Sequence, residues 1–136
     1  MSRLFNAAVL VALSGPALAT PVQCPPALSV AQTAQAVPPG MRAFEVDPKH
    51  GWINAQLSEG TPDKLGWLAP DSTRKDKTGF TNVWTLSPSP DGNWLSCVYL
   101  DTSIILSSRL PDKTTHCEIR YRTDVAPPMA AAIDCR

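Results

Sequence analysis

The stretch "THCEIRYR", Thr115 to Arg122, decides how this chain is interpreted, because it sets a histidine, a cysteine and a glutamate in succession. Successive side chains of a β-strand point to opposite faces of a sheet. A strand here predicts that Cys117, Ile119 and Tyr121 face the core and that His116, Glu118, Arg120 and Arg122 face solvent. A catalytic dyad requires hydrogen-bond contact between nucleophile and base. His116 and Cys117 point apart and are not predicted to form one.

The same alternation recurs along the chain in short runs separated by turn residues, and no apolar pattern with helical spacing lasts beyond two turns. This pattern predicts a single all-β domain, built as an antiparallel sandwich or a strongly bent sheet. A short helix over residues 28–35 is the alternative at the N-terminal end. We expect strands at residues 28–32, 41–46, 52–57, 65–68, 83–86, 94–100, 104–110, 117–122 and 129–135.

Two connections between these strands have clear sequence signals. The residues "PDGN" at 90–93 separate "VWTL" from "WLSCVYL". Because Asp-Gly is typical of tight hairpin turns, we expect the two flanking strands to pair. The segment "DSTRKDKTG" at 71–79 is wholly polar, and we expect it to be a mobile loop.

The N-terminal sequence has the pattern of a secretory signal peptide. Arg3 precedes an apolar run from Leu4 to Leu13, and small residues follow up to Ala19. This run is shorter than the roughly 20 residues that span a bilayer. We expect cleavage after Ala19, no membrane anchor, and a single exported domain over residues 20–136 in the periplasm or outside the cell.

The charge of the chain does not indicate a polyanionic partner. The 136 residues contain 12 basic and 12 acidic side chains, and removal of residues 1–19 takes one basic side chain with it. Nucleic acids and anionic membranes are bound by clusters of Lys and Arg. We therefore expect neither as a partner.

The four cysteines, Cys24, Cys97, Cys117 and Cys135, predict two disulfides in an exported protein. A hairpin between the last two strands places Cys117 opposite Cys135, with Glu118, Arg120 and Arg122 opposite Asp134, Ala132 and Ala130. Cys24 then pairs with Cys97. The pairing of Cys97 with Cys117 stays open if the strands cross between two sheets.

Candidate catalytic and metal sites are weakly supported by the sequence. The two histidines, His50 and His116, have no helical pair spacing, so no metal or cofactor is expected. A wall hydrolase would need two carboxylates in one cleft. The acids available for such a pair are Glu45, Asp47, Glu59, Asp63 and Glu118.

Four tryptophans allow a second hypothesis, a periplasmic module that binds carbohydrate or peptidoglycan. Exposed indoles can stack on sugars, but Trp84 and Trp94 lie in strands where they would fill the core. Trp52 and Trp67, each preceded by glycine, are the expected exposed pair and would form the sugar-binding surface.

A resemblance covers nearly all of the chain after the signal peptide. Its motifs are "CPP" at 24–26, "EGTPDKLGWLAPD" at 59–71, "VWTL" at 83–86, "GNWLSCVYLDTSIILSSRLP" at 92–111 and "HCEI" at 116–119. In this order they resemble a family of small exported bacterial proteins named after a locus in a type VI secretion gene cluster. The signature W-x-x-C-x-Y is formed by Trp94, Cys97 and Tyr99. The resemblance implies a periplasmic immunity protein against a wall-degrading toxin, and it implies no catalytic residues.

An immunity protein that covers an active site needs a protruding surface with polar groups around an apolar anchor. Two segments fit this description, and ordinary solvated loops are the alternative for both. We expect partner contacts from the turn with Glu59, Thr61 and Asp63, and from the loop with Asp71, Arg74, Lys75, Asp76 and Lys77.

Overall fold

The computed structural model describes residues 21–136, which form nine β-strands and one short 3-10 helix. The expected signal peptide lies outside the described residues. The elements are β1 (Ala27–Ser29), β2 (Lys49–Glu59), η1 (Pro62–Lys64), β3 (Trp67–Leu68), β4 (Ser72–Lys75), β5 (Gly79–Thr85), β6 (Asn93–Tyr99), β7 (Ile105–Arg109), β8 (His116–Arg122) and β9 (Met129–Cys135).

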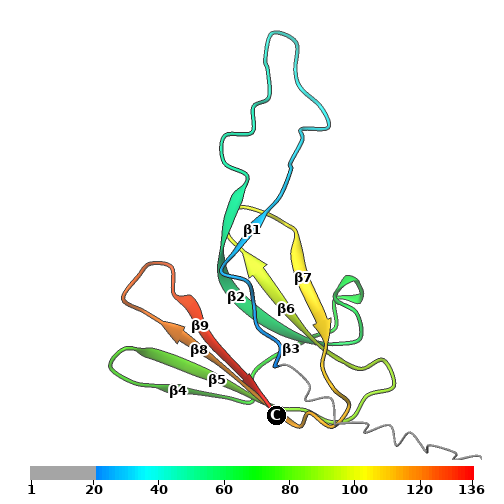
Figure 1. Ribbon diagram of the computed structural model, residues 1–136, viewed down its shortest axis with the longest axis vertical. Coiled ribbons are helices and arrows are strands. Elements are labelled where there is room, and N and C mark those ends of the chain that lie inside the picture. The colour runs from blue at the N-terminus through cyan, green and yellow to red at the C-terminus, as the bar shows by residue number, and fades with distance from the viewer. Residues whose placement is uncertain (1–20) are drawn as a thin grey trace, which may run out of the picture.

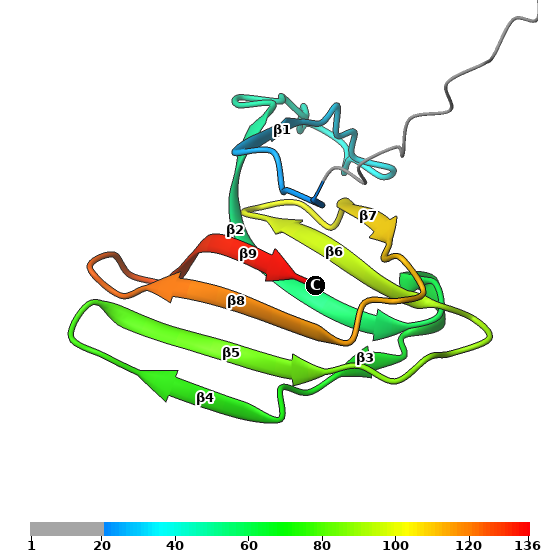
Figure 2. The same cartoon turned by 60° about the horizontal axis from the view of Figure 1, so that its bottom comes forward.

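The strands form two antiparallel sheets, which confirms the expected all-β fold. The first sheet has the order β1-β2-β6-β7, with β3 also paired to β2, and the second has the order β4-β5-β8-β9. Figures 1 and 2 show that the sheets meet near β3 and the C-terminus and spread apart toward the β4–β5 and β8–β9 turns. Together they curl into a half-barrel.

The alternation predicted for β8 is present in the structure. Cys117, Ile119 and Tyr121 are buried, and their cross-strand neighbours on β5 are Trp84, Asn82 and Phe80. The phenyl ring of Phe80 stacks on the ring of Tyr121, with centroids 4.7 Å apart. These side chains form the inner face of the second sheet, which packs against Ala55, Leu57, Leu95 and Cys97 of the first sheet.

The β8–β9 hairpin places Cys117 opposite Cys135, and the two cysteines form a disulfide. Glu118 and Arg120 lie opposite Asp134 and Ala132, as expected from the sequence. The expected pairing of Arg122 with Ala130 is wrong, because a bulge between Arg120 and Tyr121 shifts the register and brings Met129 opposite Arg122.

The second disulfide joins Cys24 to Cys97 and fixes the N-terminal segment on the first sheet. The hydroxyl of Tyr99 donates a hydrogen bond to the carbonyl of Pro25, and the amide of Trp52 donates one to the carbonyl of Pro26. These contacts hold the segment before β1 on the core. Both disulfides are the pairs that the register argument favoured.

The expected hairpin around "PDGN" is not formed. β5 pairs with β4 and β8, whereas β6 pairs with β2 and β7, so the chain passes from one sheet to the other between them. Pro88 and Pro90 have no amide hydrogen and cannot continue a strand ladder. Burial of Trp84, which is 4% exposed, against Cys117 instead decides the partner of β5.

The expected strand over residues 41–46 is wrong. These residues are exposed and belong to the long connection between β1 and β2. Gly40 has a φ of +81°, and the turn it ends places the amide of Met41 on the carbonyl of Pro38. The apolar alternation has no partner strand here, so it buries nothing.

The expected loop at residues 71–79 is wrong in part. Ser72–Lys75 is the edge strand β4, paired with β5, and only the residues that follow form a turn. The carboxylate of Asp76 closes this turn by accepting hydrogen bonds from the amides of Thr78 and Gly79. An edge strand exposed on all four residues needs no apolar side chains, which explains why its sequence resembles a loop.

Candidate functional site

The connection between β2 and β3 contains an unusual backbone conformation. The 3-10 helix η1 ends at Leu65, whose φ is +58° and whose side chain is 71% exposed. A bulky residue other than glycine is strained in this left-handed conformation. Because most of this side chain is exposed, packing in the core does not compensate for the strain. The structure therefore holds a large apolar side chain outward at an energetic cost.

Two acidic residues and a tryptophan lie close to Leu65 in the chain. Glu59 ends β2, Asp63 lies in η1, and Trp67, 39% exposed, opens β3. We call Glu59, Thr61, Asp63, Leu65 and Trp67 the turn surface. It includes the whole turn from which partner contacts are expected, and it adds two apolar anchors to those polar residues.

The turn surface is fixed to the β5–β6 connection. The amide of Gly60 donates to the carbonyl of Gly92 at 2.8 Å, and the hydroxyl of Ser89 donates to the carboxylate of Glu59 at 2.8 Å. Gly66 lies so close to the Glu59 carbonyl that a Cβ atom would approach it to 2.5 Å. The turn is thus held in one conformation, and such a rigid segment loses less entropy than a flexible one when a partner binds it.

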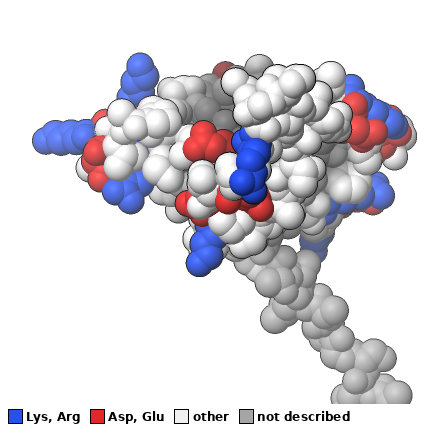
Figure 3. Space-filling model, turned by 90° about the horizontal axis from the view of Figure 1, so that it is seen from above, with Lys and Arg blue, Asp and Glu red and all other residues white. Residues whose placement is uncertain are grey.

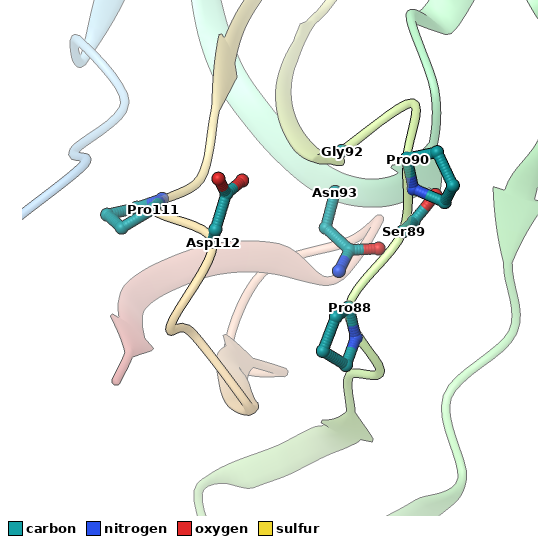
Figure 4. Close-up of a pocket in the computed structure, with 7 residues that line it drawn as sticks. All are labelled: Pro88, Ser89, Pro90, Gly92, Asn93, Pro111 and Asp112. Atoms are coloured by element: carbon teal, nitrogen blue, oxygen red, sulfur yellow. The ribbon is translucent and has the colours of Figure 1, made fainter.

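A hollow of about 410 Å³ lies beside the turn surface. Figure 4 shows Pro88, Ser89 and Pro90 on one side of it, Pro111 and Asp112 on the other, and Asn93 between them. The amide of Asn93 donates to the carbonyl of Ser87. Apolar rings around a few polar groups suit a partner side chain.

The second predicted contact region is the β4–β5 hairpin, and two of its charged side chains form ion pairs with β8. Arg120 donates to Asp76 at 2.6 and 2.9 Å, and Arg74 donates to Glu118 at 2.8 Å. The Arg120 guanidinium holds the pKa of the Asp76 carboxyl well below its usual range. Asp71 accepts a hydrogen bond from the amide of Thr85.

Lys75 and Lys77 form no ion pair within residues 21–136, so they are the basic groups of this hairpin that remain available to a partner. The hairpin turn and the turn surface lie at opposite ends of β5, as Figure 2 shows. The two predicted contact regions therefore do not form one continuous surface.

The expected sugar-binding pair, Trp52 and Trp67, is not brought together. Trp67 pairs with Ser58, six residues from Trp52 along β2, which corresponds to about 20 Å. The indole of Trp52 is half-buried against the core and donates to the carbonyl of Asn54. The structure instead places Trp67 on the same face as Trp94, with Ser58 between them.

Among the acids considered for glycoside cleavage, Glu118 differs from a general acid. Such a group needs a raised pKa. Hydrogen bonds from His116, at 3.0 Å, and Arg74 lower the pKa of Glu118. Glu45 and Asp47 accept hydrogen bonds from backbone amides near the start of β2, far along the strand from Glu59 and Asp63.

The cysteines and histidines show no site of their own. Every cysteine in residues 21–136 is in a disulfide, and no group of three metal-ligating side chains is found there.

The described residues also contain no helix with the length and apolar character of a membrane span. Viewed from above, blue and red side chains are interspersed without a broad patch of one sign (Figure 3).

Comparison with known proteins agrees with these features. The family described as "Type VI secretion system Tli immunity protein" matches residues 47–136, more than half of the chain. The chain belongs to the Tli immunity protein family. An uncharacterised 16.3 kDa protein in the trpG 5′ region of Azospirillum brasilense is 28% identical over 125 residues, covering 85% of this chain and 81% of that protein. No solved structure matches the chain.

Two features of this Tli family protein were not predicted from its sequence. One is the connection between β1 and β2, residues 30–48, which we call the arm and which projects beyond both sheets in Figure 1. Its four large exposed apolar side chains are Val37, Met41, Phe44 and Val46. The apolar alternation at residues 41–46 was a signal for it, but that alternation also fits a buried strand.

The other feature is a hollow of about 420 Å³ where the two sheets of this Tli protein spread apart. Ile53, Asn54 and Val98 line it from the first sheet. Phe80, Asn82 and Tyr121 line it from the second. Its residues come from strands far apart in the sequence, so only the tertiary structure reveals it.

Proposed function

We propose that this protein is a periplasmic immunity protein that binds a type VI effector and blocks its active site, without catalysis of its own. Membership in the Tli immunity protein family supports the immunity role. Two disulfides and the N-terminal sequence support an exported protein in an oxidising compartment. The proposed target of the effector is the cell wall, a substrate of that compartment.

The turn surface is the proposed contact region, and the outward side chain of Leu65 is the observation that carries this proposal. Interfaces gain most of their binding energy from a few apolar anchors within a polar rim. Leu65 and Trp67 supply the anchors, and Glu59, Thr61 and Asp63 supply the rim. A strained backbone conformation that serves no burial of its side chain is expected where a binding function maintains it.

The β4–β5 hairpin is proposed as a second, weaker contact through Lys75 and Lys77. Asp71, Arg74 and Asp76 mainly shape this hairpin, because their charges are already paired or hydrogen-bonded. Exposed lysines at an interface rim contribute more to the association rate than to affinity.

The direct test is titration of the oxidised protein into the product of the neighbouring gene, taken as the candidate effector. Binding and effector activity are measured on isolated peptidoglycan and on phospholipid vesicles. We expect stoichiometric binding and loss of peptidoglycan cleavage. Inhibition on vesicles alone would overturn the wall target and keep the immunity role, whereas absence of binding would overturn the immunity role.

The contact region is tested with Leu65→Asn. Asparagine tolerates the left-handed conformation, so this change removes the apolar anchor without unfolding the turn. We expect weaker effector binding by at least about tenfold, together with unchanged or higher thermal stability. Leu100→Asn, at a side chain that is 46% exposed on another turn, is the matched control and should bind normally.

A second candidate function, binding of peptidoglycan fragments, is favoured by one observation. Trp67 and Trp94 lie on one face of the first sheet, about 10 Å apart across two strand spacings. Indoles at this spacing can contact successive sugar rings. Quenching of tryptophan fluorescence by purified wall fragments, lost in Trp67→Ala, would support this function over immunity.

A further inference from the structure

The arm carries several large apolar side chains that are exposed to solvent. The exposed fractions are 44% for Val37, 69% for Met41, 71% for Phe44 and 93% for Val46. They are four of the nine large apolar side chains exposed within residues 21–136. Large exposed apolar side chains gathered on one segment indicate an interaction site more strongly than ones scattered singly over the surface.

The base of the arm is fixed to the body of the protein. The amide of Val30 donates to the carbonyl of Pro48 at 2.9 Å, and the amide of Gln32 donates to the Glu45 carboxylate at 2.8 Å. The ring of His50, which is buried, contacts the carbonyl of Leu100 at 2.8 Å. The first two bonds hold the two ends of the arm side by side, and the contact of His50 fixes the start of β2 beneath them to the β6–β7 connection.

The tip of the arm is stiffened by its sequence. Pro38 and Pro39 restrict the backbone, and the turn at Gly40 is closed by the bond from the Met41 amide to Pro38. The guanidinium of Arg42 lies 5.1 Å from the ring centre of Phe44. Met41 and Phe44 are therefore presented outward on a partly ordered segment.

We propose that the arm inserts Met41 and Phe44 into an apolar cleft of the effector and determines which effector this protein recognises. This inference rests on the proposed immunity function and adds a second contact to the turn surface. A narrow projecting arm can enter a concave site, whereas the broad outer faces of the two sheets cannot (Figure 1).

The charge of the arm favours an effector protein over a membrane as its partner. The arm contains Arg42 as its single basic side chain, together with Glu45 and Asp47. Segments that bind anionic lipid surfaces combine apolar residues with several Lys or Arg side chains. A near-neutral, slightly acidic arm suits an apolar protein cleft.

The position of the arm relative to the family match supports a role in partner choice. The match begins at residue 47, so Val37, Met41, Phe44 and Val46 all precede it. The arm pairs with no strand of either sheet, so its sequence can change without disturbing the two sheets. Such a segment is suited to distinguish one effector from another.

The test compares two double variants of the arm. Met41→Ser with Phe44→Ser removes the two anchors, and Ala34→Ser with Ala36→Ser makes the same number of changes on the same arm without removing a large side chain. Affinity for the candidate effector, the product of the neighbouring gene, is measured by calorimetry. We expect at least about a tenfold loss for the first variant and less than about a twofold change for the second.

The possible results distinguish the role of the arm from the immunity function. Normal binding by the Met41→Ser and Phe44→Ser variant would overturn the role of the arm and leave the immunity function intact. Absence of effector binding by the wild-type chain would overturn both. A wild-type dimer that this variant converts to a monomer, seen by light scattering, would show that the arm contacts a second copy, and this too would overturn the proposal.

Discussion

The hydroxyl of Tyr121 on β8 donates a hydrogen bond of 2.6 Å to Oδ1 of Asn54 on β2, and it lies 3.2 Å from the carbonyl of Ala55. This contact joins the two sheets at the point where they begin to spread apart. Burial raises the pKa of Tyr121 to about 12. The hydroxyl is therefore kept protonated as a donor well above neutral pH.

Tyr121→Phe should reduce the free energy of unfolding by about 1 kcal/mol, the usual contribution of one such hydrogen bond. Asn54 keeps the bond that it accepts from the amide of Ala55, so it is not left without a partner. Urea unfolding at pH 7 measures the change. A loss above about 3 kcal/mol would show that the hydroxyl organises more than this one contact.

The same substitution should alter the response to alkali. The folded pKa of Tyr121 lies above the unfolded value of about 10. Its contribution to stability is therefore fully present below about pH 10 and is lost as the pH rises toward 12. The stability difference between the wild type and Tyr121→Phe should shrink over that range, as followed by circular dichroism.

Asp76→Asn should make the β4–β5 hairpin less stable at neutral pH. The pKa of Asp76 is lowered chiefly by its hydrogen bond from Arg120, so its contribution is present above the unfolded pKa of about 3.9 and is lost as the pH falls below it. We expect a lower melting temperature at pH 7 and a vanishing difference from wild type in strong acid. An equal effect of Asp63→Asn, a change at an exposed turn residue, would contradict this explanation.

Gly79→Ala should disrupt the pairing of β5 with β8. A Cβ atom at Gly79 would lie 1.9 Å from the carbonyl oxygen of Tyr121 and 3.1 Å from the Cα atom of Arg122. The backbone must shift to accept it, at a cost of about 2 to 3 kcal/mol. Gly51→Ala is the control, because nothing lies within 4 Å of its added Cβ atom. Equal melting temperatures would show that the strands separate easily.

The two disulfides should differ in their contribution to stability. In the chain-entropy model, the loop of 73 residues closed by Cys24 and Cys97 contributes about 4 kcal/mol, and the loop of 18 residues closed by Cys117 and Cys135 contributes about 3 kcal/mol. Paired Cys→Ser variants measured by thermal unfolding test this order. The reverse order would indicate that the unfolded state retains structure around Cys24.

The sequence was sufficient to predict features that depend on local alternation. The buried face of β8 and its register with β9 up to Arg120 follow from the period of two residues and the positions of Cys117 and Cys135. The bulge beyond Arg120 could not be predicted, because it depends on how the hairpin bends over the first sheet.

Features that depend on the choice of a partner strand were predicted less well. The Asp-Gly turn at residues 91–92 predicted a local hairpin, but the side chains of β5 are buried better against β8. β4 resembled a loop because an exposed edge strand needs no apolar residues. The turn with Glu59, Thr61 and Asp63 was expected, whereas the left-handed conformation of Leu65 has no sequence signal of its own.

The connectivity of the disulfides has a consequence for how the chain reaches its native state. Cys24, the first cysteine in the sequence, pairs with the second, Cys97. The third, Cys117, pairs with the fourth, Cys135. A chain that enters an oxidising compartment with its N-terminus first presents its cysteines in this order. An oxidant that joins each newly exported cysteine to the unpaired cysteine before it would form both native disulfides directly, without the exchange of wrong pairs.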